Sequence, residues 1–230
     1  MIQTNEIQQR EYQLEGDLAN LTKQYLNNLL QSDRHAASKL IKDAIENGTS
    51  IKEIYLQVFQ QSQIEIGRLW QNNQITVAQE HYCTATTQLI MSQLYPYIMN
   101  AERINKRLLA VCVGGELHEI GVRMVADFFE MAGWDTYYIG ANTPIESILE
   151  TLHTQKIDLI AISATITYNI PEVSKLINSI KSSDVGSNIK ILVGGRPFNI
   201  SQELWKKVGA DGYAPDAEKA IEKAHQMILN

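Results

Sequence analysis

The sequence contains few of the residues that mark several large classes of protein. Glycine accounts for 13 and proline for 5 of its 230 residues, which excludes a collagen-like or low-complexity chain. Its two cysteines, Cys83 and Cys112, are too few for a disulfide framework and too isolated for a zinc site, so both are expected to be reduced, structural thiols. No hydrophobic run approaches the roughly 20 residues of a membrane-spanning helix.

Positive charge is also scarce. Lysine and arginine total 20 against 26 acidic residues, which gives a formal net charge of −6. A chain without a broad positive field does not attract phosphate backbones, so direct nucleic-acid binding is not expected. The amino terminus, MIQTNEIQQREYQ, lacks the basic start and hydrophobic stretch of a signal peptide, and the protein is therefore expected to be cytoplasmic, away from any membrane.

The remaining composition, 44% hydrophobic and 20% charged, is typical of a globular chain with one large or two modest domains. In the first hundred residues, hydrophobic side chains recur at helical spacing and predict four helices. The pair Asn47-Gly48 is typical of a helix end. Ser50 with Glu53 and Thr76 with Gln79 are typical of helix starts. Four helices joined by short turns favour a bundle.

From Arg107 onward, short β-branched runs alternate with helical stretches, which indicates a parallel sheet with crossover helices. Strands are expected at 108–113, 135–139, 158–163, 190–193 and 212–214, and helices near 119–132, 144–154, 171–182, 201–208 and 216–228. The predicted fold class is α/β, with an N-terminal four-helix bundle followed by a Rossmann-like, flavodoxin-type sheet of five parallel strands. The predicted domains are the bundle at 1–100, a linker at 101–107 and the sheet domain at 108–230.

The loop after the first predicted strand is the first place to look for a ligand, because open parallel sheets bind ligands where the strand order reverses. It reads VGGELHEIG, which is neither a dinucleotide-binding nor a phosphate-binding glycine pattern. Glu116 stands two residues before His118 and can accept a hydrogen bond from one ring nitrogen, as the partners of metal-bound histidines do. From the residues alone, the alternative is an exposed helix start.

The run Glu116 to Gly121 resembles the cobalamin-binding signature of methionine synthase and its relatives. The resemblance implies cobalamin as the cofactor and His118 as the lower cobalt ligand, in place of the cofactor's own dimethylbenzimidazole. Ser163-Ala164-Thr165 resembles the family's contact with the nucleotide tail, and Gly194-Gly195 supplies backbone without side chains beside it. The cofactor-binding residues implied in this half are Glu116, Leu117, His118, Glu119, Ile120, Gly121, Ser163, Thr165, Gly194 and Gly195.

A second motif lies in the helical half, where Trp70 is followed after nine residues by Glu80-His81. From the residues alone, a core tryptophan and a solvated pair are the alternative. The spacing resembles that of cobalamin-dependent light-sensing regulators of the CarH and AerR group, in which the bundle covers the upper face of the corrin. This resemblance implies that Trp70, Glu80 and His81 adjoin the upper axial group. Adenosylcobalamin is the favoured form, and methyl- and hydroxocobalamin are the alternatives.

Two functions follow from these resemblances. The first is a non-enzymatic, light-responsive cobalamin sensor that forms homo-oligomers and signals through a protein partner such as a transcription regulator. Glu116 favours it, because methyl-transfer proteins usually carry aspartate there. Gln71 and Tyr82 depart from the sensors, which often have histidine and glutamate at these positions, and leave His81 as the candidate upper ligand. The alternative is a corrinoid carrier subunit that moves a methyl group between partner enzymes.

Overall fold

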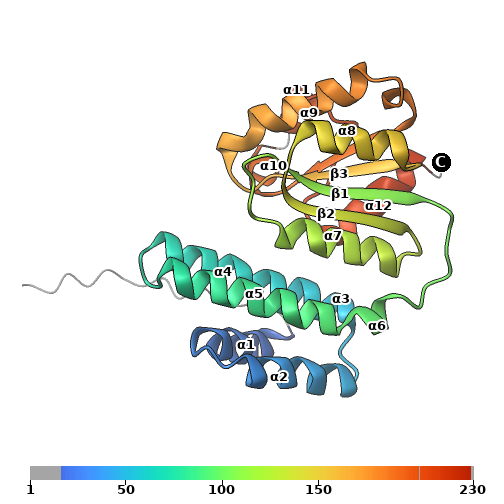
Figure 1. Cartoon of the computed structure of the whole chain (residues 1–230). Helices are drawn as coiled ribbons and strands as arrows, with labels where there is room; N and C mark the ends of the chain where they lie inside the picture. Colours follow the sequence, from blue (N-terminus) through green and yellow to red (C-terminus); the bar gives the residue numbers. More distant parts are fainter. Residues whose placement is uncertain (1–16, 202, 229–230) are drawn as a thin grey trace, which may run out of the picture. The chain divides into compact units, whose positions relative to one another are not determined.

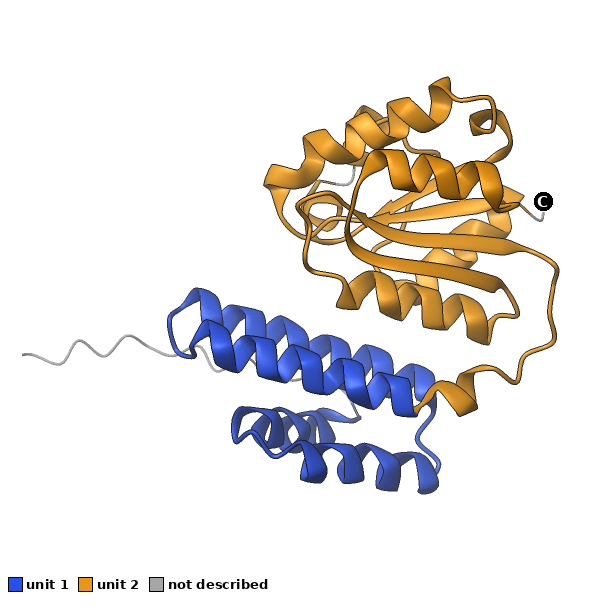
Figure 2. Cartoon of the chain, in the orientation of Figure 1, with its two compact units in different colours: residues 1–93 blue, residues 94–230 orange. Residues whose placement is uncertain are grey.

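The computed structural model describes residues 17–201 and 203–228 (Figure 1). The chain divides into two compact units, residues 1–93 and 94–230 (Figure 2). This division falls ahead of the predicted linker. The predicted assignment of 1–100 to a bundle domain, 101–107 to a linker and 108–230 to a cobalamin-binding domain stays a prediction. Across the described ranges, no helix is both long and hydrophobic enough to span a membrane.

The first unit is helical, as predicted. Its helices are α1 (Ala19–Leu30), α2 (Arg34–Glu46), α3 (Ile51–Glu53), α4 (Gln60–Gln71) and α5 (Val77–Gln93). A π-helical turn, Ile54–Phe59, joins α3 to α4 within what was expected to be one regular helix. Ile54, Tyr55, Val58 and Phe59 of this turn are all buried, and π-helical turns typically occur as such short bulges within α-helices.

The helix starts predicted from capping residues are confirmed. The Ser50 backbone N–H donates to Glu53 Oε2 at 3.0 Å, and the Glu53 N–H donates back to Ser50 Oγ at 3.2 Å. Thr76 and Gln79 make the same exchange at 2.9 and 3.2 Å. Each exchange satisfies two N–H groups that the first turn of a helix leaves unpaired, which explains why these residues begin helices.

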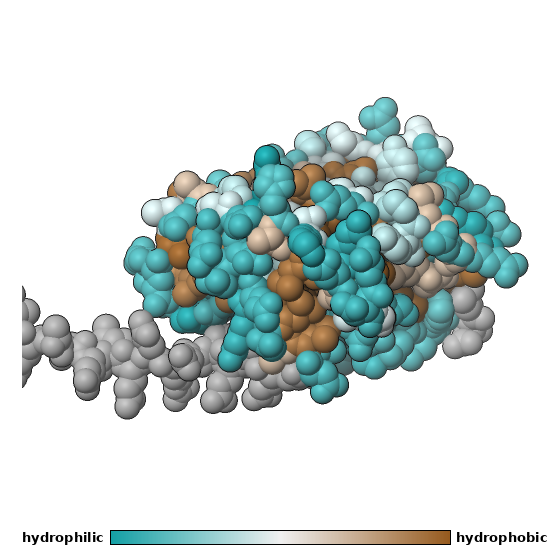
Figure 3. Space-filling model, turned by 90° about the horizontal axis from the view of Figure 1, so that it is seen from below, coloured by the Kyte–Doolittle hydropathy of each residue, from teal (hydrophilic) through white to brown (hydrophobic). Residues whose placement is uncertain are grey.

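The core of the first unit combines aromatic packing with a buried polar contact. The Tyr25 ring lies 5.4 Å from that of Phe59, and its buried hydroxyl is 3.0 Å from Thr87 Oγ1. The large hydrophobic side chains of α1 and α2 are buried or partly buried. Figure 3 shows hydrophobic surface in narrow stripes between hydrophilic side chains on the face seen from below. The unit therefore closes around a core of its own.

The second unit contains one five-stranded parallel sheet in the order β2-β1-β3-β4-β5. The strands are β1 (Arg107–Val113), β2 (Asp135–Thr143), β3 (Leu159–Ser163), β4 (Lys190–Gly194) and β5 (Gly212–Tyr213). The helices are α6 (Tyr95–Ile98), α7 (Ile120–Met131), α8 (Ile145–Thr154), α9 (Ile170–Ser182), α10 (Arg196–Ile200), α11 (Leu204–Lys207) and α12 (Ala217–Ile228). The predicted α/β fold class is confirmed.

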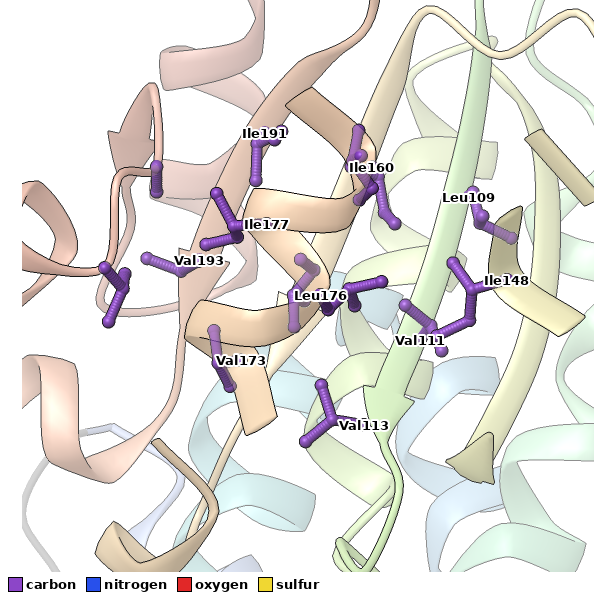
Figure 4. Packing of buried hydrophobic residues seen from close by; sticks show 14 of the residues in the cluster. Leu109, Val111, Val113, Ile148, Ile160, Val173, Leu176, Ile177, Ile191 and Val193 are labelled. Atoms are coloured by element: carbon purple, nitrogen blue, oxygen red, sulfur yellow. The ribbon is translucent and has the colours of Figure 1, made fainter. Parts of the chain in front are cut away.

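Helices cover both faces of the sheet. Alternate residues of β1 face opposite sides: Leu109, Val111 and Val113 pack with side chains of α8 and α9 (Figure 4). Leu108, Ala110 and Cys112 pack with α7 and α12. Burial on both faces explains why β1 reads as an unbroken hydrophobic run rather than an alternating one.

Two elements differ from their predicted extents. The helix expected at 201–208 is shorter, since α11 spans Leu204–Lys207, and a separate helix, α10, begins earlier, at Arg196, with Pro197 in its first turn. Strand β2 continues past Ile139 to Thr143, although Gly140 and Asn142 have positive φ angles of +73° and +51°. The pairing with β1 shifts register twice in this segment, so the extension carries no regular β-strand pattern in the sequence.

Candidate functional site

The loop between β1 and α7 holds the residues predicted to carry the chemistry. Strand β1 lies between β2 and β3, so the strand order reverses at its carboxyl end, where open parallel sheets bind ligands. Glu116 and His118 lie in this loop, after Val113 and before Ile120. The His118 side chain is 43% exposed, whereas that of Glu116 is 0% exposed. A buried carboxylate thus stands behind an accessible imidazole.

One oxygen of Glu116 fixes the orientation of His118. Glu116 Oε1 lies 2.6 Å from His118 Nδ1 and accepts the His118 backbone N–H at 3.0 Å. An ionised carboxylate only accepts hydrogen bonds, so Nδ1 carries the ring proton and donates it to Glu116. A metal bound to this imidazole therefore bonds through Nε2, with the carboxylate raising the basicity of the ring.

The other oxygen of Glu116 is held by the loop after β3. Glu116 Oε2 accepts the backbone N–H groups of Thr165 and Ile166 at 2.8 and 3.1 Å and the side-chain amide of Asn169 at 2.9 Å. Asn169 is buried at the end of a short 3₁₀ turn, Thr167–Asn169. The carboxylate therefore accepts five hydrogen bonds from two loops and ties the His118 loop to β3.

These contacts determine the protonation state of Glu116. Burial of the carboxyl acts to raise its pKa, but hydrogen bonds from the His118 ring, the Asn169 side chain and backbone N–H groups outweigh burial and lower the pKa to about 2. Glu116 is therefore ionised at neutral pH. Its negative charge keeps the ring proton of His118 on Nδ1.

Local sequence patterns did not single out Asn169 as a member of this site. It lies 53 residues from Glu116 along the chain, in a segment, ITYNI, without a motif of its own. Its place near the end of the third predicted strand was the available signal, since the carboxyl ends of neighbouring parallel strands meet at one edge of a sheet.

The tail-contact residues predicted from the resemblance lie at the same edge. Ser163 ends β3 and pairs in register with Cys112 of β1 and Gly194 of β4. Thr165 reaches Glu116 through its backbone N–H. Gly195 has φ +101° and ψ 175°, a conformation that is essentially restricted to glycine. A Cβ at Gly195 would lie 2.1 Å from the Ala164 carbonyl oxygen, so the fold itself requires this glycine.

Replacing Gly195 by alanine is expected to destabilise the protein by about 3 kcal/mol, because both the backbone conformation and the approach to Ala164 exclude a side chain. Gly114→Ala is the matched control, since a Cβ there would meet its nearest neighbour at 4.0 Å and at ordinary φ. Urea unfolding of both variants measures the difference. Equal loss of stability in the two variants would contradict the assigned strain.

The remaining residues of the loop motif, Leu117 and Glu119 to Gly121, differ from one another in their surroundings. Leu117 is 70% exposed, and Glu119 Oε2 accepts the Ala141 backbone N–H at 3.0 Å. Ile120 and Gly121 begin α7. A Cβ at Gly121 would meet no described atom within 4 Å, so the fold does not require glycine there, and space beside the start of α7 is left for a ligand.

Trp70, Glu80 and His81 belong to the first unit. Trp70 lies in the last turn of α4 and is 41% exposed. Glu80 and His81 lie near the start of α5, with His81 Nδ1 2.5 Å from Glu80 Oε2. Glu80 Oε1 also accepts the Thr84 hydroxyl at 3.0 Å. The roles of these three residues toward a cofactor stay predictions.

Comparison with known proteins identifies the family. Residues 106–222 match the B12 binding domain, and residues 21–95 match a second family of the same description. The first match covers half of the chain, so the chain belongs to the B12-binding family. Its cofactor is accordingly cobalamin, as predicted. The donor set fits this cofactor, because a histidine with a carboxylate on Nδ1 is a common ligand of metal ions.

Curated relatives are corrinoid proteins. Dimethylamine corrinoid protein 1 of Methanosarcina acetivorans is 32% identical over 117 residues, which are 50% of this chain and 54% of the relative. Trimethylamine corrinoid protein 1 of the same organism is 24% identical over 200 residues, 86% of this chain and 92% of the relative. The chain spans about half the length of the dimethylamine relatives such as corrinoid proteins 1 and 3 of M. acetivorans.

A solved structure shares the fold. The monomethylamine corrinoid protein of Methanosarcina barkeri aligns with a TM-score of 0.80 at 19% identity, over 92% of this chain and all of that chain. It confirms the arrangement of a helical domain followed by a Rossmann-like domain.

The prediction of a light-sensing regulator is wrong. The relatives matched by sequence are named as methylamine corrinoid proteins, which conflicts with a photoreceptor, with signalling and with transcription regulation. The predicted transcription-regulator partner is wrong for the same reason. The spacing of Trp70, Glu80 and His81 misled because residues near two helix ends describe a local arrangement, which does not specify the reaction at a bound cofactor.

Proposed function

We propose that the chain is a corrinoid carrier protein, a subunit that holds cobalamin while a methyl group passes between partner enzymes. The observation that carries the proposal is the His118–Glu116 pair, an accessible imidazole oriented by a buried carboxylate, in a chain whose relatives are named as methylamine corrinoid proteins. Those names favour a methylated amine as the methyl donor. The activation of donor and acceptor is assigned to the partner enzymes.

The residues of the second unit have distinct tasks in this proposal. When bound, cobalamin supplies a cobalt ion that can take up and release a methyl group. His118 would hold the cobalt through Nε2, while Glu116 keeps the ring proton on Nδ1 and resists rotation of the ring. Asn169 and the backbone of Thr165 and Ile166 hold the carboxylate in place. Gly121 leaves space beside the start of α7.

The proposal is tested with purified protein loaded with hydroxocobalamin. After reduction with titanium(III) citrate, methyl iodide is added as a chemical methyl donor and the visible spectrum is recorded. The carrier function predicts that the reduced state is reached and that about one methyl group is taken up per chain. It also predicts that methylcobalamin binds at least about tenfold more tightly than adenosylcobalamin, a difference of about 1.4 kcal/mol. Equal binding of both forms without methyl uptake would overturn it.

A further inference from the structure

The end of β2 lies against the loop that carries His118. Strand β2 is the neighbour of β1 on the side opposite β3 (Figure 1). Its last residues, Gly140 to Thr143, pair with β1 through two register shifts and have two positive φ angles, at Gly140 and Asn142. A strand end that departs from regular pairing in this way often re-aims groups beside a functional site.

Three hydrogen bonds join this segment to the His118 loop. Asn142 Oδ1 accepts the Gly115 backbone N–H at 2.8 Å, and the Asn142 N–H donates to the Glu116 carbonyl oxygen at 2.9 Å. The Ala141 N–H donates to Glu119 Oε2 at 3.0 Å. The contacts therefore fall on both sides of His118, on Gly115 and Glu116 before it and on Glu119 after it.

The backbone conformation of Asn142 allows its N–H and its side chain to contact the same loop at once. Its φ of +51° is left-handed, a region that asparagine tolerates better than most residues. In this conformation Asn142 donates its N–H to the loop while its side-chain oxygen accepts another N–H of the same loop. Gly115, the partner of the side chain, has a φ of +81°, so the two left-handed residues face each other across the contact.

We infer that Asn142 is a positioning residue for His118, acting as a second support of the loop on the β2 side while Glu116 supports it on the β3 side. The inference rests on the proposed function, because the purpose of the support is to present His118 to the cofactor. With the end of β2 and the loop after β3 both bonded to the His118 loop, the imidazole is restrained from two directions. Preorganised ligands of this kind lose less conformational freedom when a metal binds.

The test uses Asn142→Gly in the full chain. Glycine adopts the left-handed backbone but removes the side-chain acceptor, whereas Asn142→Asp keeps an acceptor and tolerates the same φ. Asn105→Gly is the matched control, because Asn105 also has a positive φ, +55°, in the same unit. Without cofactor, amide exchange of Gly115 is expected to accelerate about three- to tenfold in Asn142→Gly, and to stay near wild type in Asn142→Asp and Asn105→Gly.

The second readout is the visible spectrum of each variant loaded with hydroxocobalamin. We expect the ratio of His118-ligated to unligated cofactor to fall about three- to tenfold in Asn142→Gly and to be restored in Asn142→Asp. His118→Ala defines the fully unligated spectrum. An unchanged ratio in Asn142→Gly overturns the inference even if thermal stability falls, since a purely structural role would move stability alone. If His118→Ala also leaves the spectrum unchanged, the proposed site itself fails.

Discussion

Replacing His118 by alanine is expected to abolish histidine ligation of the bound cofactor and to return it to a spectrum without a lower ligand from the protein. The His118 side chain is 43% exposed and is hydrogen-bonded to Glu116. Because so much of it is exposed, its removal costs little packing, and the fold should persist. Because outer partners of metal ligands are worth about 10- to 100-fold in affinity, loss of the ligand itself should cost at least that much. Titration with hydroxocobalamin, followed in the visible range, measures both effects.

His153→Ala is the control for this prediction. His153 is also an exposed histidine of the second unit, bonded to Asp184 at 2.7 Å and located on α8. Its replacement should leave the affinity and the spectrum of bound cobalamin unchanged. A His118→Ala protein with the wild-type spectrum would remove His118 from the role of lower ligand and with it the carrier site proposed for this loop.

Replacing Glu116 by glutamine is expected to weaken cobalamin binding about 10- to 100-fold. The amide oxygen of the new residue can still accept hydrogen bonds from Thr165, Ile166 and Asn169, which hold the present Oε2. Its NH₂ group then faces His118, so Nδ1 must accept a hydrogen bond instead of donating one. The ring proton moves to Nε2, the nitrogen that would otherwise bind the metal. Isothermal titration with hydroxocobalamin checks the loss.

The same substitution should change the acid stability of the protein without cofactor. A carboxyl whose pKa falls from 4.5 to about 2 on folding contributes about 3 kcal/mol of stability at neutral pH. Because the folded-state pKa is the lower one, this contribution is complete above pH 4.5 and is lost as the pH falls toward 2. Glu116→Gln has no carboxyl to protonate there.

Urea unfolding of the wild type and of Glu116→Gln between pH 6 and pH 2 tests this prediction. The free energy of unfolding should fall more steeply with decreasing pH in the wild type than in Glu116→Gln, by up to about 3 kcal/mol over the range. Parallel curves would show that the five hydrogen bonds to Glu116 do not favour its ionised form in the folded state.

Most of the secondary structure could be predicted because the signals are local. The capping pairs Ser50–Glu53 and Thr76–Gln79 satisfy N–H groups within their own first turns. The unbroken hydrophobic run of β1 follows from burial on both sheet faces. The extension of β2 through Gly140 and Asn142 was missed, because its shape depends on contacts with the neighbouring loop rather than on a strand pattern.

The predicted function was less secure than the predicted cofactor. Cobalamin followed from a short run, Glu116 to Gly121, whose histidine and carboxylate lie two residues apart and meet within one loop. The choice between sensor and carrier depended on Trp70, Glu80 and His81 and on glutamate rather than aspartate at position 116. Glutamate and aspartate offer the same acceptor atoms to His118, so that difference does not distinguish a sensor from a methyl carrier.

The sequence by itself determined the two-part architecture, the cofactor and the pairing of Glu116 with His118, which we propose presents an imidazole to the cofactor. The tertiary structure alone decided how that pair is held. Asn169 lies 53 residues from Glu116, and Asn142 lies 27 residues from Gly115. A parallel sheet brings the carboxyl ends of strands remote in sequence to one edge, where their loops exchange hydrogen bonds. Residue spacing along a chain carries no record of such pairings, so these supports emerged only with the strand order β2-β1-β3.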